Sequence, residues 1–129
     1  TYLKIIQELG LENYVVLRTK FIPDGDVRYY FSVADIVAQP YRTATQSGVS
    51  QIAYHFEKPM LVTNVGGLAE IVPDGKVGYV VNVDPKQIAD ALVDFYTQKR
   101  ADEFIENIKV EKLKYEWSRM TVAIDNLFI

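Results

Sequence analysis

The segment PYRTATQSGV, residues 40–49, places hydroxyl-bearing side chains, one arginine and one glycine directly after a short apolar run. Ser47 or Thr45 suits the capping position of a helix, and Gly48 lets the backbone approach a ligand closely. The N–H groups that open a helix lack intrahelical partners, and the helix macrodipole favours an anion beside them. Arg42 can add a charge-assisted hydrogen bond to that anion. From the pattern alone, an ordinary helix cap and tight turn is the favoured interpretation of this segment, and a predicted anion site is the alternative.

A second polar turn, residues 64–67 with the letters NVGG, follows another apolar run. Gly66 and Gly67 allow positive φ values or a close approach to a ligand. From the pattern alone, a tight strand-to-helix turn is the favoured interpretation. Glu70 lies just inside the next helical turn, either facing a cleft or as an ordinary carboxylate near a helix start. This turn is a second candidate loop of the same cleft.

The single histidine, His55, lies late in a predicted helix, where a surface or packing role is expected. The carboxylates show neither a paired acid–base arrangement nor metal-ligand spacing, and no Ser-His-Asp arrangement emerges. Because the chain has no cysteine, disulfides and cysteine-based metal or redox sites are excluded. We therefore expect no metal site, and the sequence identifies no catalytic residue.

The composition limits the classes of protein to which the chain can belong. Its 129 residues suit one domain, and an apolar fraction of 49% is enough for a packed core. A net charge of −3 with no basic block argues against nucleic-acid binding through phosphate neutralisation. No apolar run approaches the roughly 20 residues that a membrane span needs. The chain starts without methionine, as if cut from a longer protein, and its first residues predict a helix instead of a signal peptide.

Hydrophobic periodicity alternates between the patterns of strands and helices along the chain. Short apolar runs predict four buried strands, at residues 14–17, 36–38, 60–63 and 78–81. Helical spacing predicts helices at residues 1–9, 27–33, 47–56 and 68–72, another from Pro85 with Asp84 as its N-cap, and a long one over 101–128. A break in the last helix near 115–118 is left open. Gly10 is expected to stop the first helix, and a Pro-Asp-Gly turn at 73–75 to end the fourth.

This alternation indicates an α/β fold, a Rossmann-like parallel sheet of about four strands with flanking helices and right-handed crossovers. Residues 1–129 form one partial domain without a linker or a repeat, and two further strands are expected on its N-terminal side. Ligands of such sheets bind beyond the carboxyl ends of the strands. Three loops fit that rule, at residues 18–23, 39–48 and 64–67, and the middle loop carries the predicted anion site.

Four passages resemble the nucleotide-sugar-binding domain of GT-B glycosyltransferases, in the large retaining family known as glycosyl transferases group one. They are FIPDGDVRYYFSVADIVAQPY at 21–41, EKPMLVTNVGGLAEIVPDGKVGYVV at 57–81, DPKQIADALVDFY at 84–96 and YEWSRM at 115–120. The resemblance runs in order from about Val15 to the end of the chain. It implies the C-terminal, donor-binding domain of a two-domain enzyme whose cleft holds a nucleoside-diphosphate sugar.

The resemblance also implies the roles of individual residues. The donor diphosphate is expected at Thr45, Gln46, Ser47, Gly48 and Val49, the nucleobase beside Lys20 and Phe21, and the cleft loop at Gly66 and Gly67. Transfer with retention is implied, without a metal or a cofactor besides the nucleotide-sugar substrate, to a glycan or lipid-linked acceptor. A cytoplasmic enzyme of polysaccharide biosynthesis follows, with contact to the inner face of the membrane left open.

The donor site departs from the family pattern at two positions. The family carries two glutamates, one near the sugar and one on the ribose, and counting back from Lys58 places them at Ala44 and Ile52. A shift of one residue brings Gln51 to the ribose position, where its amide can bond a hydroxyl. We expect Gln51 and Arg42 to contact the ribose or the sugar. The alternative is a non-catalytic nucleotide-sugar-binding or interaction module that has lost both glutamates, and a nucleotide-sugar epimerase of the same architecture is disfavoured.

The family's acceptor domain has no counterpart in these residues. Half a site cannot orient two reactants, so the isolated chain is expected neither to transfer sugar nor to bind a nucleotide tightly. A sheet edge that lacks its neighbouring strands is exposed together with apolar surface. Self-association through that surface is therefore expected.

Overall fold

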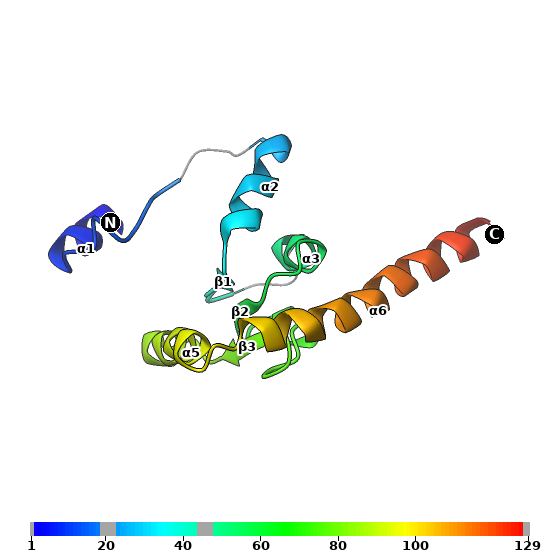
Figure 1. The fold of residues 1–129 in the computed structure, drawn as a ribbon. Coiled ribbons are helices and arrows are strands. Elements are labelled where there is room, and N and C mark those ends of the chain that lie inside the picture. Colours follow the sequence, from blue (N-terminus) through cyan, green and yellow to red (C-terminus); the bar gives the residue numbers. More distant parts are fainter. Residues whose placement is uncertain (1, 19–22, 44–47, 128–129) are drawn as a thin grey trace.

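The computed structural model describes residues 2–18, 23–43 and 48–127 (Figure 1). The elements in chain order are α1 (Tyr2–Glu8), α2 (Asp24–Val33), β1 (Val37–Gln39), α3 (Gly48–His55), β2 (Met60–Thr63), α4 (Leu68–Ile71), β3 (Gly78–Val81), α5 (Pro85–Thr97) and α6 (Ala101–Leu127). Within the described residues, the strands form one parallel sheet in the order β1-β2-β3. The predicted α/β fold with a parallel sheet and flanking helices is therefore confirmed.

β2 is the centre of this sheet, and all four of its residues are buried. Met60 lies opposite Val37 of β1 and Gly78 of β3 in the register. Successive side chains of a strand point to opposite faces, so β2 contributes to two separate cores. The short apolar run was predicted as a strand covered on both sides, and this is confirmed.

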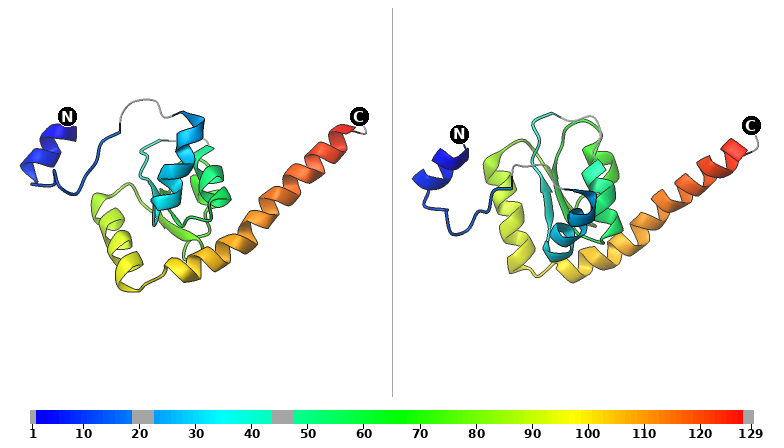
Figure 2. Two further views of the ribbon diagram at one scale, coloured as in Figure 1. Left: turned by 45° about the horizontal axis from the view of Figure 1, so that its top comes forward. Right: turned by 90° about the horizontal axis from the view of Figure 1, so that it is seen from above.

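Helices cover both faces of the sheet, with α3 and α5 on opposite sides (Figure 2). The core on the α3 side is made by Ala53, Tyr54, Met60, Val62, Leu68, Val72, Val77 and Ile108. The core on the α5 side is made by Leu61, Tyr79, Ala91, Phe95 and Phe104. α6 contributes to both cores, through Ile108 and Phe104, and so closes the end of the sheet.

Gly78 opens β3 at a point where two strands come very close. A Cβ built on Gly78 would lie 1.7 Å from the carbonyl oxygen of Met60, far inside contact distance. No side chain fits there unless the strand moves, so glycine is required. The preceding turn follows the Pro-Asp-Gly signal, since Gly75 has a φ of 77° and Asp74 Oδ1 accepts a hydrogen bond from the Val80 N–H at 2.9 Å.

Two helix ends follow the predicted backbone chemistry. Asp84 caps α5 by accepting a hydrogen bond from the Lys86 N–H at 3.0 Å. Gly10 ends α1 with a φ of 66°, and the Leu11 N–H reaches back to the Ile6 carbonyl at 2.9 Å. Both predictions are confirmed.

The end of α3 differs from the end of α1, because the residue in the left-handed conformation after α3 is a glutamate instead of a glycine. Glu57 has a φ of 56°, a conformation that glycine adopts at lower cost. Its carboxylate forms an ion pair with Lys112 of α6 at 2.8 Å. The hydrogen bond from Lys112 lowers the pKa of Glu57. This pair therefore ties the C-terminal end of α3 to α6.

The predicted strand at residues 14–17 is wrong. These residues form no strand, and Tyr14 and Val16 are 82% and 70% exposed. A strand needs a hydrogen-bonded neighbour, and none of the described strands pairs with this segment. α1 also stands apart from the sheet, with Leu3 and Leu9 exposed (Figures 1 and 2). The described sheet therefore has one strand fewer than expected.

α6 is continuous over Ala101–Leu127, so the break considered near 115–118 is absent. Its first turns lie on the sheet, and its backbone then extends well away from it (Figures 1 and 2). In the described part of the chain, no helix is both long enough and apolar enough to cross a membrane.

Candidate functional site

The loops that follow the strands lie together at the carboxyl edge of the sheet. The Thr63 hydroxyl at the end of β2 donates a hydrogen bond to the Tyr41 carbonyl, in the loop after β1. The Asn64 N–H donates to the Val81 carbonyl at the end of β3, at 2.7 Å. These bonds hold the first residues of two loops at the edge where parallel sheets bind their ligands.

A buried hydrogen bond fixes the start of α3 at the same edge. Gln39 Nε2, at the end of β1, donates to Ser50 Oγ at 2.9 Å. The two residues are 1% and 0% exposed. Ser50 lies in the first turn of α3, two residues after Gly48. The helix therefore begins beside the carboxyl end of β1, where an anion-binding helix start would have to lie.

The first residue of α3 is open to its surroundings. Gly48 is exposed, and a Cβ built on it meets no atom within 4 Å. Val49, the next residue, is half-buried. The first four N–H groups of a helix have no intrahelical acceptor. As far as the described residues go, there is consequently room beside Gly48 for the polar atoms of a ligand to reach the helix start.

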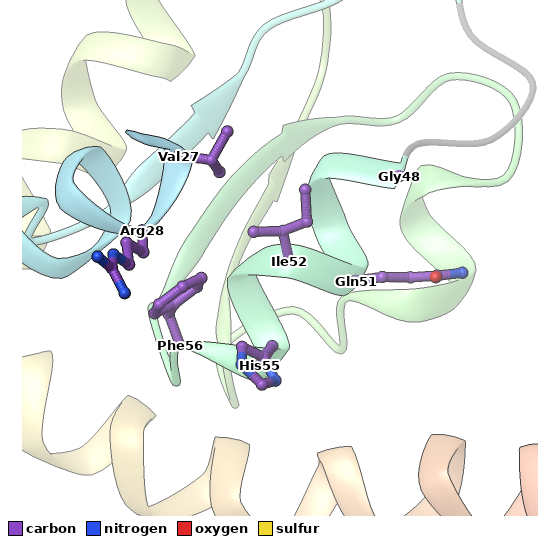
Figure 3. Close-up of a pocket in the computed structure, with 7 residues that line it drawn as sticks. All are labelled: Val27, Arg28, Gly48, Gln51, Ile52, His55 and Phe56. Atoms are coloured by element: carbon purple, nitrogen blue, oxygen red, sulfur yellow. The ribbon is translucent and has the colours of Figure 1, made fainter. Parts of the chain in front are cut away.

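A groove of about 460 Å³ runs along α3 from Gly48 and is bounded on its other side by α2 (Figure 3). Its described lining is Val27, Arg28, Gly48, Gln51, Ile52, His55 and Phe56. This lining holds a guanidinium and an imidazole and no carboxylate, although the net charge of the chain is −3. Phe31 stacks on Phe56 with ring centroids 5.7 Å apart and joins the two helices. The groove suits a ligand that has both an apolar part and a negative charge.

The structure brings only some of the predicted site residues together. Gly48 and Gln51 line the same groove, as does Ile52. Arg42 is exposed in the loop after β1 and is not part of the described lining. Six further positions named from the sequence fall outside the described residues: Lys20, Phe21, Ala44, Thr45, Gln46 and Ser47.

The turn at residues 64–67 has the backbone that its glycines predict. Gly66 has a φ of 52°, a value that favours glycine. The Val65 N–H closes the turn on the Thr63 carbonyl at 2.8 Å, and Gly67 precedes the four-residue helix α4. Glu70 is exposed in that short helix. The unusual φ value is confirmed, and contact of this loop with a ligand stays a prediction.

Sequence reasoning missed Val27, Arg28, Gln39 and Ser50. The predicted second strand ended at residue 38, whereas β1 is Val37–Gln39. A glutamine that follows an apolar run and is buried must find a hydrogen-bond partner. Gln39 was therefore the one signal in the sequence for this bond, because a buried glutamine after a strand predicts a polar partner such as Ser50 on the next helix. The α2 residues carried no comparable signal.

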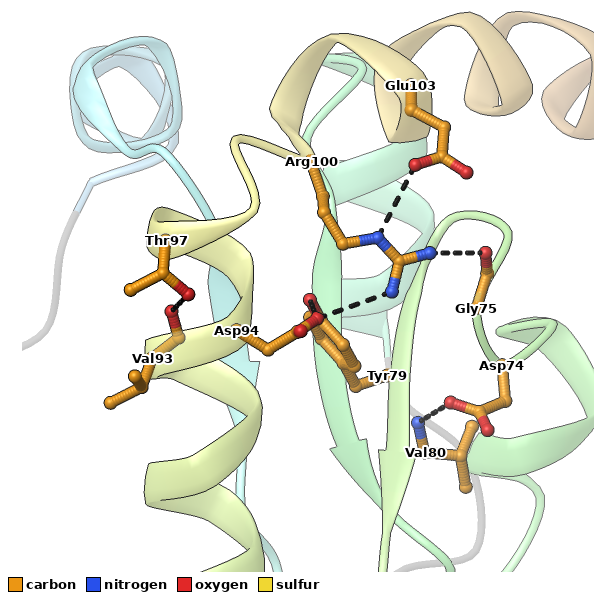
Figure 4. A network of polar contacts seen from close by, with 9 residues as sticks. All are labelled: Asp74, Gly75, Tyr79, Val80, Val93, Asp94, Thr97, Arg100 and Glu103. Atoms are coloured by element: carbon orange, nitrogen blue, oxygen red, sulfur yellow. Dashed lines mark hydrogen bonds and ion pairs between the residues drawn. The ribbon is translucent and has the colours of Figure 1, made fainter.

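A dense polar cluster lies at the other end of the sheet (Figure 4). Arg100 contacts Asp94 at 3.4 Å, Glu103 at 3.4 Å and the Gly75 carbonyl at 3.1 Å. The Tyr79 hydroxyl donates to Asp94 at 2.6 Å. Gly75 and Tyr79 lie near the amino end of β3, so the cluster is remote from the carboxyl edge. It joins β3, α5 and α6.

The pKa values in this cluster follow from packing. Burial of the phenol, together with its hydrogen bond to Asp94, raises the pKa of Tyr79 to about 12. The hydrogen bond from Tyr79, followed by the interaction with Arg100, lowers the pKa of Asp94. Shifted pKa values often mark functional sites, but here each group is satisfied by a neighbour that holds two elements together. Among the residues that the structure describes, no group of three or more His, Asp or Glu side chains is arranged to hold a metal ion.

The chain is similar in sequence to known proteins. The family model described as glycosyl transferases group 1 matches residues 1–98. The D-inositol 3-phosphate glycosyltransferase of Paenarthrobacter aurescens is 33% identical over 100 residues, which cover 75% of this chain and 24% of the relative. The enzyme of the same name from Corynebacterium urealyticum is 31% identical over 93 residues, 69% of this chain and 22% of the relative. The chain thus spans about a quarter of the length of the curated relatives it matches.

Solved structures share the fold at 20% identity. Sucrose-phosphate synthase from Thermosynechococcus elongatus matches with a TM-score of 0.84 over 98% of this chain and 32% of its own. Alr3699/HepE of Anabaena, solved in complex with UDP, has a TM-score of 0.78 over 98% of this chain and 35% of its own. The C-terminal domain of LpcC, a glycosyl transferase group 1 family protein from Francisella tularensis, has a TM-score of 0.77 over 87% and 59%. The expected GT-B type of α/β architecture is confirmed.

The Tyr79 cluster makes a prediction about alkaline pH. The pKa of Tyr79 is raised in the folded chain to about 12, above its unfolded value of about 10. The stability that this shift contributes is present below pH 10 and is lost as pH rises through 12. Tyr79→Phe should lower the free energy of unfolding by about 1 kcal/mol at neutral pH, because the hydrogen bond to Asp94 is gone. Between pH 10 and 12, the free energy of unfolding of this variant should fall less than that of the wild type. Urea unfolding measured across this range tests both effects.

The matched control is Tyr2→Phe, which removes a phenol that is 75% exposed. This variant should follow the wild type at every pH. Equal alkaline declines in the wild type and in Tyr79→Phe would contradict the account of the cluster.

Proposed function

The chain belongs to the glycosyl transferases group 1 family, and on that premise we propose that it forms the donor-binding part of a sugar-transferring enzyme. The proposed donor is a nucleoside-diphosphate sugar. The observation that carries the proposal is the open start of α3 at Gly48, which lies at the carboxyl edge of the sheet and continues into a groove. The complex of Alr3699/HepE with UDP, in a protein of the same fold, supports a nucleotide ligand.

The proposed contacts follow from the chemistry of the groove. The diphosphate lies against the N–H groups of Gly48 and Val49, where the helix dipole favours negative charge. Arg28 supplies a cation at the groove, and the Gln51 amide bonds a ribose or sugar hydroxyl. These groups stabilise the phosphates without a metal, so the proposed transfer is metal-independent and proceeds with retention, as the family resemblance implies. The same resemblance supports a cytoplasmic enzyme of polysaccharide synthesis, with contact to the inner face of the membrane left open.

Substitution of Gly48 tests the diphosphate contact. Gly48→Ala adds a methyl group that meets no atom of the described residues within 4 Å, so the chain should keep its stability or gain up to about 1 kcal/mol from better helix propensity. The methyl group would occupy the space of the phosphate, and the Kd for UDP should rise at least about tenfold, a loss of ~1.4 kcal/mol. Calorimetric titration of the longest natural polypeptide that contains this chain measures the effect.

Gly25→Ala is the matched control, since a Cβ at Gly25 in α2 also meets no atom within 4 Å. It should leave the Kd for UDP unchanged. Equal UDP affinities in the wild type and in Gly48→Ala would remove the proposed phosphate site from the start of α3.

A non-catalytic binding module is the second candidate, and Ile52 favours it. The family's ribose glutamate has no counterpart in the described lining of the groove, which contains no carboxylate. The two candidates differ in turnover. We expect the longest natural polypeptide to release UDP or GDP from nucleotide sugars when a glycan or lipid-linked acceptor is present. Nucleotide binding without release in any acceptor screen would favour the module.

We further propose that the isolated chain transfers no sugar and associates with itself. Tyr2 and Leu3 of α1, and Leu9 directly after it, are 75%, 64% and 66% exposed. Within the described sheet, the outer edge of β1 has no partner strand. Sedimentation velocity should show a coefficient that rises with protein concentration. Leu3→Glu should weaken this association, whereas Val93→Glu on the exposed side of α5 should not. A single monomer peak over a wide concentration range would refute self-association.

A further inference from the structure

The Gln39–Ser50 hydrogen bond is a polar contact in a place where apolar packing is the simpler solution. Both residues are almost fully buried, and they lie beside the core formed by β2, α3 and α4. Replacing both partners of a buried hydrogen bond by apolar groups is often nearly neutral for stability. Burial of this pair is therefore not explained by stability alone.

The hydrogen bond constrains the orientation of α3 relative to β1. An apolar contact tolerates small rotations and shifts of a helix, whereas a hydrogen bond of 2.9 Å between two side chains restricts both distance and angle. Gln39 is the last residue of β1, so it transmits the position of the sheet edge to the first turn of α3. At the opposite end of α3, the ion pair between Glu57 and Lys112 fixes the helix to α6.

We propose that Gln39 and Ser50 are positioning residues that set where the N–H groups of Gly48 and Val49 point. This inference rests on the proposed function, because those N–H groups are the proposed diphosphate ligands. Neither residue belongs to the described lining of the groove, so the pair acts through α3. Misplacement of a binding group by about 1 Å is enough to cost much of its effect.

A double-mutant cycle separates positioning from packing. Gln39→Met and Ser50→Ala should each lower the urea midpoint, by up to about 1 M, because each leaves a buried polar group without this bond. The double variant should recover the part of that loss that comes from breaking this bond, since neither of the two groups that form it remains. Its Kd for UDP should nevertheless stay about tenfold above the wild-type value, which corresponds to ~1.4 kcal/mol. A merely structural pair would recover stability and affinity together.

Tyr96→Phe is the control for loss of a hydrogen bond between elements. Tyr96 on α5 donates to Asp35 at 3.1 Å, just before β1 begins and away from the carboxyl edge. This variant should leave the Kd for UDP unchanged. All affinities are measured in the longest natural polypeptide that contains the chain.

Hydrogen exchange gives a readout that needs no nucleotide. The amides of Ile52 and Ala53 bond to carbonyls in the first turn of α3, so their protection reports how firmly that turn is held. Ser50→Ala, which favours helix formation by itself, should lower their protection while amides in α5 keep theirs. This measurement also serves if Gln39→Met fails to fold.

The outcomes are distinguishable. If the wild type binds no UDP, the proposed function fails, and exchange at Ile52 and Ala53 decides whether the pair positions α3. If the wild type binds UDP and the double variant binds equally well, the positioning inference is overturned and the proposed function stands. Unchanged protection in Ser50→Ala also overturns the inference. Weak UDP binding in a double variant of restored stability supports it.

Discussion

Burial of β2 is the constraint on which the rest of the structure depends. Its side chains alternate between two cores, with Met60 and Val62 on one face and Leu61 on the other. A strand that is buried on both faces needs a strand at each edge and helices on each side. Glycine at position 78 lets β3 approach Met60 closely enough to form one of those edges. Because the three strands of the described sheet run parallel, their carboxyl ends lie at the same edge, and the polar loops lie along that edge as a consequence.

The two ends of the sheet use polar groups in different ways. At the amino end of β3, Arg100 satisfies two carboxylates and a backbone carbonyl, and the cluster binds elements to one another. At the carboxyl edge, Gln39 bonds to Ser50 in the first turn of α3, and Thr63 bonds to Tyr41 in the loop after β1. Gly48, the first residue of α3, is exposed. The shifted pKa values of Tyr79 and Asp94 belong to the amino end of β3, whereas the exposed helix start lies at the carboxyl edge. In this chain, packing of the phenol of Tyr79 explains the pKa shift without any reaction.

The sequence predicted those elements that local pattern determines and failed where a distant partner decides. The strands at residues 60–63 and 78–81 and the Asp84 cap match the structure, since apolar runs and a capping carboxylate act locally. The run at 14–17 has strand propensity but no neighbour with which to form hydrogen bonds, and it forms no strand. β1 was placed one residue early, because Gln39 looks like a loop residue until Ser50 is brought beside it. Of the candidate site, the start of a helix near Gly48 followed from the sequence, whereas the groove between α3 and α2 depended on tertiary packing.

Under the proposed function, the neutral residues at positions 51 and 52 reduce the negative charge of the groove relative to the family pattern and leave the proposed anion site in place. A glutamate that bonds ribose hydroxyls also repels phosphates nearby, so it helps only where cations outweigh it. This chain has a net charge of −3, and the described groove lining offers one guanidinium and no carboxylate. Gln51 can still bond a hydroxyl without adding repulsion, and Ile52 extends the apolar wall. The departure from the family pattern therefore bears on how strongly a ribose would be held, while the case for an anion rests on the helix start and Arg28.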